Sequence, residues 1–434
     1  MRKGFGTRAL HAGKDKGERG HNTPICPSAS WEIRTEKELE AGLSGKLPIY
    51  HRYGGNPTIS YVERKISDLE GGAETRLLAS GMAAVNMVVH GAMKSGDHAI
   101  FIGPMYGGTY DTIQRLRRRE GYNFTLLAAT DPDLPQKVYS AIFERTALIW
   151  GEITTNPTLA AWDVPGIKEV LDRRFLELKQ QRPVSVAQEA AFAKWRKPIL
   201  GVDPSFTGPY NFRAFEHGAG VIGNSDTKYR GGHGAFVLGS VTVSEQLLEE
   251  NPDFWREANQ WAVEVGPVPD PHPARLLGWF LEDIHVRAPV HNRNANIVAR
   301  FFECHPAVLS VSYPGLRKDK NDLQYDIARK LLVTPNGDNG YGGMVTFRLE
   351  GGLDAVKRFL FAPRNSGSVI VHKASLGYTK TICESPVLLS QHSMLPADKE
   401  LFGITDDLIR LSVGLEDIED ILADLKYRLK RSQR

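Results

Sequence analysis

The sequence predicts an α/β protein with a mostly parallel sheet in a large domain and a smaller α+β domain at its C-terminal end. Three observations lead to this prediction. Short apolar runs alternate with helix-like stretches from about residue 56 to 280, polar residues directly follow several of these runs, and the pattern changes after about residue 281. Repeated alternation of strand and helix is typical of a parallel sheet with helices on both faces.

Residues 1–55 are predicted to form an irregular N-terminal arm, because they are rich in Gly, Pro, Ser and Thr and show little periodicity. An arm of this kind often packs on a partner subunit. We therefore expect it to contact a neighbouring subunit of an oligomer.

Residues 56–280 form the predicted large domain. Strands are expected at residues 98–102, 124–127, 147–150, 199–203 and 220–223, and helices at residues 58–69, 83–94, 110–120, 134–144 and 164–181. The charged stretch 173–197 is interpreted as an insertion of unassigned role.

Residues 281–434 form the predicted small domain. A long helical pattern at about 271–302 leads into it, and strands are expected at residues 344–348, 368–371 and 408–412. A last amphipathic helix is predicted at about 415–429, because five apolar residues share one face at helical spacing: Ile418, Ile421, Leu422, Leu425 and Leu429.

Composition narrows the class of protein. The 434 residues include 54 basic and 51 acidic side chains, a balance that gives no reason to expect a nucleic acid or an anionic membrane as a partner. The N-terminus is polar, unlike a secretory signal, and no run reaches the roughly 18 apolar residues of a membrane helix. Cys26, Cys304 and Cys383 are scattered, which favours neither a disulfide framework nor a metal site. We therefore expect a cytoplasmic protein.

Chemically distinctive residues lie directly after three predicted strands. Asp203 ends the strand Ile-Leu-Gly-Val, and a carboxylate at the end of a buried strand needs a partner. Asn156 follows the strand that ends near Trp150, and residues 224–233 follow the strand at 220–223. Ligands of parallel sheets bind beyond these carboxyl ends, so a shared site is expected there.

The same residues meet the needs of a phosphorylated pyridine aldehyde. Lys228 can form an imine with the aldehyde, and the hydroxyls of Ser225 and Thr227 can hold the phosphate. The stretch Ser80-Gly-Met-Ala-Ala84 begins a predicted helix, where backbone N–H groups are free to bind an anion. Asp203 can keep the ring nitrogen protonated and Tyr106 can stack on the ring. Each signal is weak alone; their order and spacing predict a pyridoxal 5'-phosphate site.

The chain resembles the Cys/Met-metabolism family of pyridoxal-phosphate enzymes, which includes cystathionine γ-synthase, cystathionine lyases and methionine γ-lyase. The resemblance runs from Thr7-Arg-Ala-Leu-His-Ala-Gly13 to the final helix. The family's lysine motif, S-A-T-K-Y-x-G-G-H, stands here as Ser225-Asp-Thr-Lys-Tyr-Arg-Gly-Gly-His233. It implies an aminotransferase-like fold of type I and a homotetramer of two tight dimers with shared active sites.

The resemblance also implies roles for matching positions. Lys228 would hold the cofactor as a Schiff base and move protons, and Tyr106 would stack on the ring and assist proton transfer. Asp203 would bind the pyridine nitrogen and Asn156 the ring's phenolic oxygen. The phosphate would be bound by Gly81, Met82, Ser225 and Thr227, together with Tyr50 and Arg52 of the neighbouring subunit. Arg410 would clamp the substrate carboxylate, and Ser375 would orient that end of the site.

Simpler interpretations stay open for several of these residues. Arg52 could form an ordinary surface ion pair, Arg410 could pair with Asp406 or Asp407, and Glu152 could support the site or cap a solvated turn. The chain also departs from the family's pattern. It carries an added glycine at Gly54-Gly55, Pro-Ser in place of the usual Asn-Thr after Asp203, and a lost proline before Asn156. Gly108 stands where methionine γ-lyases typically carry a cysteine, and Ala374 where cystathionine lyases often carry an acid.

The resemblance implies α,γ-elimination or γ-replacement on a homoserine- or homocysteine-type amino acid. β-Elimination from a cystathionine-like substrate is the alternative within the family. A non-catalytic pyridoxal-phosphate-binding regulator is a remote alternative, because the chain shows no appended DNA-binding module. An aminotransferase would share the fold, but the motif from Ser225 to His233 argues against it.

Overall fold

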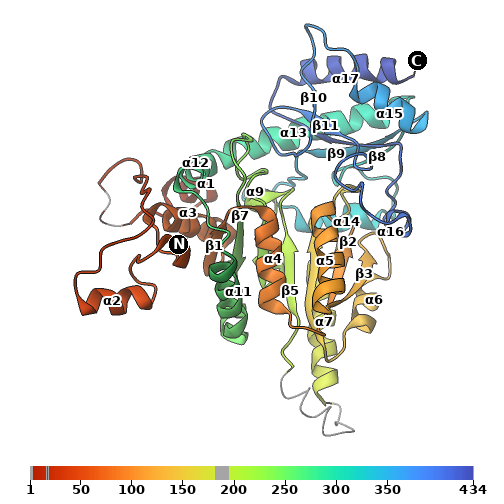
Figure 1. Cartoon of the computed structure of the whole chain (residues 1–434). Coiled ribbons are helices and arrows are strands. Elements are labelled where there is room, and N and C mark those ends of the chain that lie inside the picture. The colour runs from red at the N-terminus through yellow and green to blue at the C-terminus, as the bar shows by residue number, and fades with distance from the viewer. Residues whose placement is uncertain (1–2, 16, 18, 181–194, 434) are drawn as a thin grey trace.

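The structure is a computed structural model that describes residues 3–15, 17, 19–180 and 195–433. Its centre is a seven-stranded sheet with the order β1-β7-β6-β5-β4-β2-β3 (Figure 1). Strands β2 to β6 are parallel, whereas β7 is antiparallel to both of its neighbours. The strands are β1 (Glu74–Leu78), β2 (His98–Gly103), β3 (Asn123–Ala128), β4 (Thr146–Glu152), β5 (Ile199–Asp203), β6 (Val221–Asn224) and β7 (Gly239–Val243). The predicted mostly parallel sheet is confirmed.

Helices cover both faces of this sheet. Along β2, Ala99 and Phe101 enter one apolar core, whereas Ile100 and Ile102 enter the core on the opposite face. Side chains of α4 (Gly81–Ala92), α5 (Gly107–Glu120) and α11 (Pro252–Val265) complete the first core, and those of α6 (Leu134–Ala141) and α7 (Val164–Gln180) the second. Burial on both faces explains why the central strands are continuous apolar runs.

All five strands predicted for the large sheet are present, whereas β1 and β7 were not predicted. These two strands pair with each other at one edge of the sheet. Their sequences, Glu-Thr-Arg-Leu-Leu and Gly-Ser-Val-Thr-Val, mix polar and apolar residues, so neither stands out as an apolar run.

A second sheet lies above the first in Figure 1, with α13 (Ile284–Glu303), α15 (Gly352–Leu360) and α17 (Ile418–Ser432) around it. Its strand order is β10-β11-β12-β9-β8. The strands are β8 (Val308–Ser312), β9 (Met344–Leu349), β10 (Val371–His372), β11 (Ile382–Glu384) and β12 (Leu408–Ser412). Phe302, Phe347, Phe359 and Leu425 belong to its separate apolar core. The predicted smaller α+β part is confirmed.

Three predicted elements differ in extent. The strand expected at 368–371 begins only at Val371, because the N–H groups of Val369 and Ile370 donate to the Asp424 carboxylate of α17. The single helical pattern at 271–302 is two helices, α12 (Pro271–Glu282) and α13 (Ile284–Glu303), which meet at Asp283. Residues 173–180 of the expected insertion continue α7, and residues 181–194 lie outside the described part of the chain.

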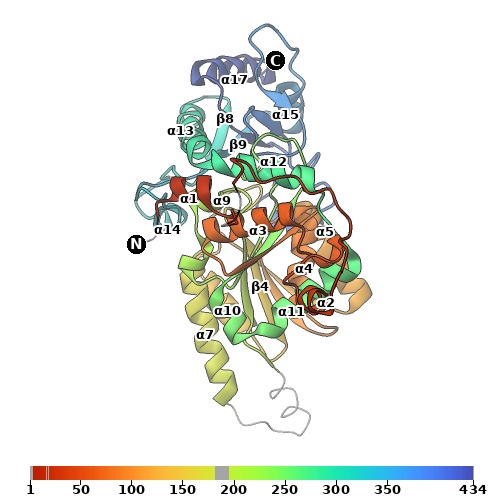
Figure 2. The ribbon, with the colours of Figure 1, turned by 90° about the vertical axis from the view of Figure 1, so that its left-hand side faces the viewer.

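The arm is more regular than the sequence predicted. It contains α1 (Phe5–His11), α2 (Glu36–Leu43) and the 3-10 turn η1 (His51–Tyr53). Phe5 and Ala9 of α1 are buried in a core that they share with α3 (Pro57–Glu70) and α12, as the neighbouring ribbons in Figure 2 illustrate. Tertiary burial therefore orders a segment whose own sequence has little periodicity.

The other described helices are short connectors: α9 (Gly208–Asn211), η2 (Ala214–His217), α10 (Glu245–Glu250), α14 (Leu323–Leu331) and α16 (Pro396–Leu401). Among the described residues, every helix is too short or too polar to cross a lipid bilayer.

Candidate active site

A cavity of about 490 Å³ opens where β4 and β5 end and β6 passes into the loop that carries Lys228. Side chains of the second sheet, including Glu384 and Arg410, close its other side. All of the predicted site residues line this cavity except Tyr50 and Arg52. The carboxyl ends of the parallel strands thus bring residues from distant parts of the chain together in one cavity, as expected for this type of sheet.

Lys228 lies in the loop after β6, and its Nζ donates a 2.6 Å hydrogen bond to Ser375 Oγ. Burial, and secondarily the Arg410 guanidinium, lowers the pKa of Lys228 to about 8. A larger fraction of this amine is therefore neutral near pH 7 than for an ordinary lysine, and the neutral amine is the nucleophile that attacks an aldehyde.

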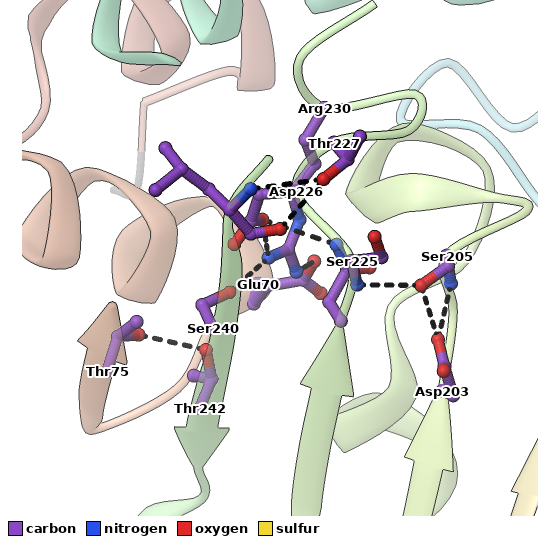
Figure 3. Close-up of polar contacts among 12 residues, drawn as sticks. Glu70, Thr75, Asp203, Ser205, Ser225, Asp226, Thr227, Arg230, Ser240 and Thr242 are labelled. Atoms are coloured by element: carbon purple, nitrogen blue, oxygen red, sulfur yellow. Dashed lines mark hydrogen bonds and ion pairs between the residues drawn. The ribbon is translucent and has the colours of Figure 1, made fainter. Parts of the chain in front are cut away.

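Asp203 ends β5, and one of its carboxylate oxygens, Oδ1, accepts two hydrogen bonds from Ser205, from Oγ at 2.6 Å and from N at 2.9 Å (Figure 3). Ser205 Oγ in turn accepts the Ser225 N–H at 2.8 Å. Burial raises the pKa of Asp203 to about 6 despite the two hydrogen bonds from Ser205. The Ser205 hydroxyl thus orients the acid.

Glu152 lies beside Asp203 in register, at the end of β4, and its Oε1 accepts the Tyr106 N–H at 2.6 Å. Tyr106 is the N-cap residue of α5, so the Glu152 carboxyl caps this helix from the neighbouring strand. Burial, together with the Asp203 carboxylate, raises the pKa of Glu152 well above its usual range. Of the two interpretations of Glu152, support of the site describes the geometry better than a solvated turn.

The predicted phosphate-binding end is formed by the start of α4 and the loop after β6. Ser80 caps α4 by accepting the Ala83 N–H at 3.1 Å, and Gly81 and Met82 begin the helix. A Cβ on Gly81 would lie 2.6 Å from Ser225 Cβ, so only glycine fits this approach. The Thr227 hydroxyl is engaged with Leu238, donating to its carbonyl and accepting its N–H, each at 3.1 Å.

Arg410 lies on β12 and its side chain is buried. Nη1 donates to Asn156 Oδ1 at 2.7 Å, and Nη2 forms a 2.8 Å ion pair with Glu384, its cross-strand neighbour on β11. The alternative pairing with Asp406 or Asp407 is wrong, since Asp407 pairs with Arg348 instead. Arg410 therefore points into the cavity and not towards the protein surface.

Ser375 and Asn156 connect the two sides of the cavity. Ser375 has φ +86°, its hydroxyl also accepts from Tyr378 Oη at 2.9 Å, and its carbonyl accepts Arg410 Nη2 at 3.4 Å. The Asn156 carbonyl accepts Gln391 Nε2 at 3.3 Å. A network from both sheets fixes the residues that surround Lys228.

Tyr50 and Arg52 lie apart from the cavity, in the arm. Arg52 Nη1 donates to the Val263 carbonyl at 2.7 Å, and its guanidinium lies near the Tyr50 and Tyr53 rings. Tyr50 is partly exposed. In a single chain, therefore, these two residues do not reach the Lys228 site.

The cavity is also lined by Ser205, Glu384 and Ser390, which were not predicted from the sequence. Ser390 Oγ donates to Glu384 Oε1 at 2.6 Å and so completes the surroundings of the Arg410 ion pair. A Ser two residues after a strand-end Asp was a readable signal, whereas Glu384 ends a strand of only three residues that no pattern marks.

The residues present fit pyridoxal phosphate by their chemistry. They offer a buried lysine of lowered pKa, a buried carboxyl at the end of β5, a helix start too close to Ser225 for any side chain at Gly81, and the half-exposed Tyr106 ring. Among the described residues, no cluster of three or more His, Cys, Asp or Glu side chains could hold a metal ion. Fold and site together define a class: an α/β protein with a buried lysine of lowered pKa in the cavity at the carboxyl ends of its strands.

Comparisons with known proteins identify the family within that class. The family described as Cys/Met metabolism PLP-dependent enzyme matches residues 6–176 and 180–430, and the chain belongs to it. The chain is 31% identical to L-methionine gamma-lyase of Porphyromonas gingivalis, over 99% of this chain and 98% of the relative. It is 32% identical to cystathionine gamma-synthase of Mycobacterium bovis, over 98% and 97%.

A solved structure supports the fold over the full length. The crystal structure of cystathionine gamma-lyase from Lactobacillus plantarum, complexed with L-serine, superimposes with a TM-score of 0.83 at 27% identity and covers 100% of both chains. The predicted type I fold is confirmed. The protein is a pyridoxal-phosphate-dependent lyase or transferase of Cys/Met metabolism that acts on a small amino-acid substrate.

Proposed function

We propose that the protein catalyses α,γ-elimination or γ-replacement on a homoserine- or homocysteine-type amino acid. The observation that carries this proposal is the placement of Lys228 and Arg410 in one cavity, with Ser375 in contact with both. An amino acid whose carboxylate binds the planar Arg410 fork would present its α carbon towards the lysine. The γ-lyase and γ-synthase names of the relatives support γ chemistry over β chemistry.

The residues would divide the work as follows. Lys228 would hold the cofactor, Asp203 its ring nitrogen and Asn156 its phenolic oxygen, while the start of α4 with Gly81, Met82, Ser225 and Thr227 would hold its phosphate. When bound, pyridoxal phosphate supplies an electron sink for the carbon that loses its proton. Lys228 Nζ would remove the α proton and then a β proton, and Tyr106 or Lys228 would protonate the leaving group.

The arm gives a reason to propose a homotetramer of two tight dimers. Tyr50 and Arg52 lie outside the cavity of their own chain, which supports a role at the phosphate of a neighbouring subunit. The proposed parts are accordingly the arm (1–55), the large cofactor-binding domain (56–280) and the small domain (281–434).

L-Cystathionine tests the reaction, since it can be cleaved on either side of its sulfur. Cleavage at the γ carbon with one water gives cysteine, 2-oxobutanoate and ammonia, whereas cleavage at the β carbon gives homocysteine, pyruvate and ammonia. We expect 2-oxobutanoate from cystathionine and from other γ-substituted amino acids, or a replacement product when a thiol is added. Pyruvate as the sole product would favour the β-elimination alternative, and cofactor binding without turnover of any substrate the regulator.

A further inference from the structure

The loop that carries Lys228, here called the lysine loop (residues 225–233), holds a buried ion pair that spans the lysine. Asp226 and Arg230 lie four residues apart with Lys228 between them, and both side chains are almost completely buried. Asp226 stands where the family motif quoted above has alanine, and Arg230 stands at its unspecified position. The proposed reaction uses neither residue.

Arg230 ties the lysine loop to two other elements (Figure 3). Its Nη1 donates to Asp226 Oδ1 at 2.7 Å and to Ser240 Oγ of β7 at 2.8 Å. Its Nη2 donates to Glu70 Oε1, at the last residue of α3. One guanidinium therefore connects the loop, the sheet and a helix, and its planar fork suits this arrangement better than an ammonium would.

Lys228 and Arg230 share one tight turn. The Lys228 N–H donates to the Ser225 carbonyl at 3.1 Å, the Gly231 N–H to the Asp226 carbonyl at 2.9 Å, and the Gly232 N–H to the Lys228 carbonyl at 2.7 Å. A displacement of Arg230 would therefore be transmitted through the backbone to Lys228.

A second arginine holds the other side of the turn. Arg287 of α13 donates from Nη1 to the Tyr229 carbonyl at 3.0 Å and from Nη2 to the Arg230 carbonyl at 3.2 Å. Gly232 has φ +70°, and a Cβ there would lie 2.1 Å from Arg287 Nη1, so this position favours glycine. The turn is thus held between two guanidinium groups.

The Arg230 cluster, formed by Glu70, Asp226 and Arg230, is expected to contribute little to the stability of the fold. Two carboxyl groups surround one guanidinium, and Glu70 Oε2, Asp226 Oδ2 and Arg230 Nε have no hydrogen-bond partner among the described residues. Burial raises the pKa of Glu70, as expected for a carboxyl taken out of water. Buried ion clusters of this kind often contribute no more stability than apolar side chains of similar volume. The arrangement is better explained by a role of the cluster in positioning the lysine loop.

We propose that Arg230 is a positioning residue for Lys228, which it acts on through the turn that both residues share. This inference rests on the proposed function, because it takes Lys228 to be the residue that captures the cofactor. Because Arg230 also pairs with Glu70, the last residue of α3, this helix would hold the lysine loop in place.

Two pairs of variants test the proposal in the full-length protein. Arg230→Lys keeps the charge and loses the fork; its matched control is Arg428→Lys, a change in another buried arginine that pairs with an Asp four residues away, Asp424 of α17. Glu70→Ala removes an acceptor, and Glu70→Gln restores one without the charge. The readouts are the thermal midpoint, kcat and KM, and the rate at which apoenzyme captures pyridoxal phosphate, followed by visible absorbance.

We expect Arg230→Lys and Glu70→Ala to lower kcat and the capture rate about tenfold or more, with KM changed by less than about threefold, since small misplacements of a catalytic group are costly. Glu70→Gln should restore both rates, and Arg428→Lys should lose stability but neither rate. Wild-type rates in Arg230→Lys and Glu70→Ala, or equal losses in Arg428→Lys, would overturn the proposal. If Arg230→Lys does not fold, the comparison of the two Glu70 variants decides.

Borohydride reduction of wild-type holoenzyme, followed by peptide mass analysis, separates this inference from the proposed function. Label on another lysine would refute the proposed function itself. Label on Lys228, together with unaffected Arg230 and Glu70 variants, would refute only the role of Arg230.

Discussion

Lys228 Nζ donates a 2.6 Å hydrogen bond to Ser375 Oγ, so the lysine of the loop after β6 is held by a residue from the part of the chain that builds the second sheet. The same serine accepts from Tyr378 and has φ +86°, a backbone conformation that favours glycine. The contact makes the lysine's position depend on how the two sheets meet.

Ser375 variants separate its hydroxyl from its backbone. Ser375→Ala and Ser375→Gly both remove the Lys228 acceptor, but only glycine adopts a positive φ without strain. We expect both to lower kcat/KM about tenfold, as for a lost hydrogen bond to a charged group. Glycine should be the more stable of the two by about 1 kcal/mol in urea unfolding. A glycine variant with wild-type kcat/KM would contradict a role for the hydroxyl.

Arg410→Lys should not behave as a conservative change. Lysine keeps the charge but lacks the planar fork with which one guanidinium can bind Asn156, Glu384 and a substrate carboxylate together. We expect kcat/KM for the amino-acid substrate to fall about 100-fold, mainly through KM. Arg348→Lys is the control, because Arg348 lies on the adjacent strand but pairs with Asp407 and is partly exposed. Equal effects of the two changes would argue against the carboxylate clamp.

The lowered pKa of Lys228 predicts how apoenzyme captures an aldehyde. Only the neutral amine reacts, and the neutral fraction rises as pH passes through the pKa of about 8. The capture rate for pyridoxal phosphate should therefore reach half of its maximum near pH 8 and level off above about pH 9. A rate that keeps rising towards pH 10 would mean that Lys228 titrates as an ordinary lysine.

We expect Asp203→Asn to lower the activity of the enzyme but to raise the unfolding free energy of the apoprotein. Burial raises the pKa of Asp203 in the folded chain to about 6, above its unfolded value near 3.8, so the fold favours the protonated acid. That stabilising contribution is complete below the unfolded pKa and is lost as pH rises through about 6. Apo Asp203→Asn should thus exceed wild type in unfolding free energy at pH 7.5, on the order of 2 kcal/mol, but not at pH 3.5.

Activity should move in the opposite direction. Asn cannot offer a carboxylate to a protonated ring nitrogen, so we expect kcat of Asp203→Asn to fall at least about 100-fold. An active variant, or one less stable than wild type at pH 7.5, would contradict the assigned role of Asp203. Urea unfolding of the two apoproteins at both pH values provides the measurement.

Local patterns in the sequence predicted the fold class and several cavity residues, and the family resemblance supplied others, such as Arg410 and Ser375. Asp203, Asn156 and Lys228 are legible since each follows an apolar run, and parallel strands bring such ends together. What sequence could not supply is pairing between distant segments. Glu384 lies on a strand of only three residues and faces Arg410 on the neighbouring strand. Arg230 pairs with Glu70, which is 160 residues away in the sequence. Strands β1 and β7 were not predicted for a related reason: their pairing with each other defines them, and neither is an apolar run.

Borohydride reduction shows directly whether Lys228 captures pyridoxal phosphate. Wild-type protein and Lys228→Ala are loaded with pyridoxal phosphate, reduced with borohydride, digested and analysed by mass. We expect one cofactor-labelled peptide in the wild type, with the label on Lys228, and no labelled peptide in Lys228→Ala, which should also lack turnover. Label on another lysine in the wild type, or wild-type turnover by Lys228→Ala, would contradict it.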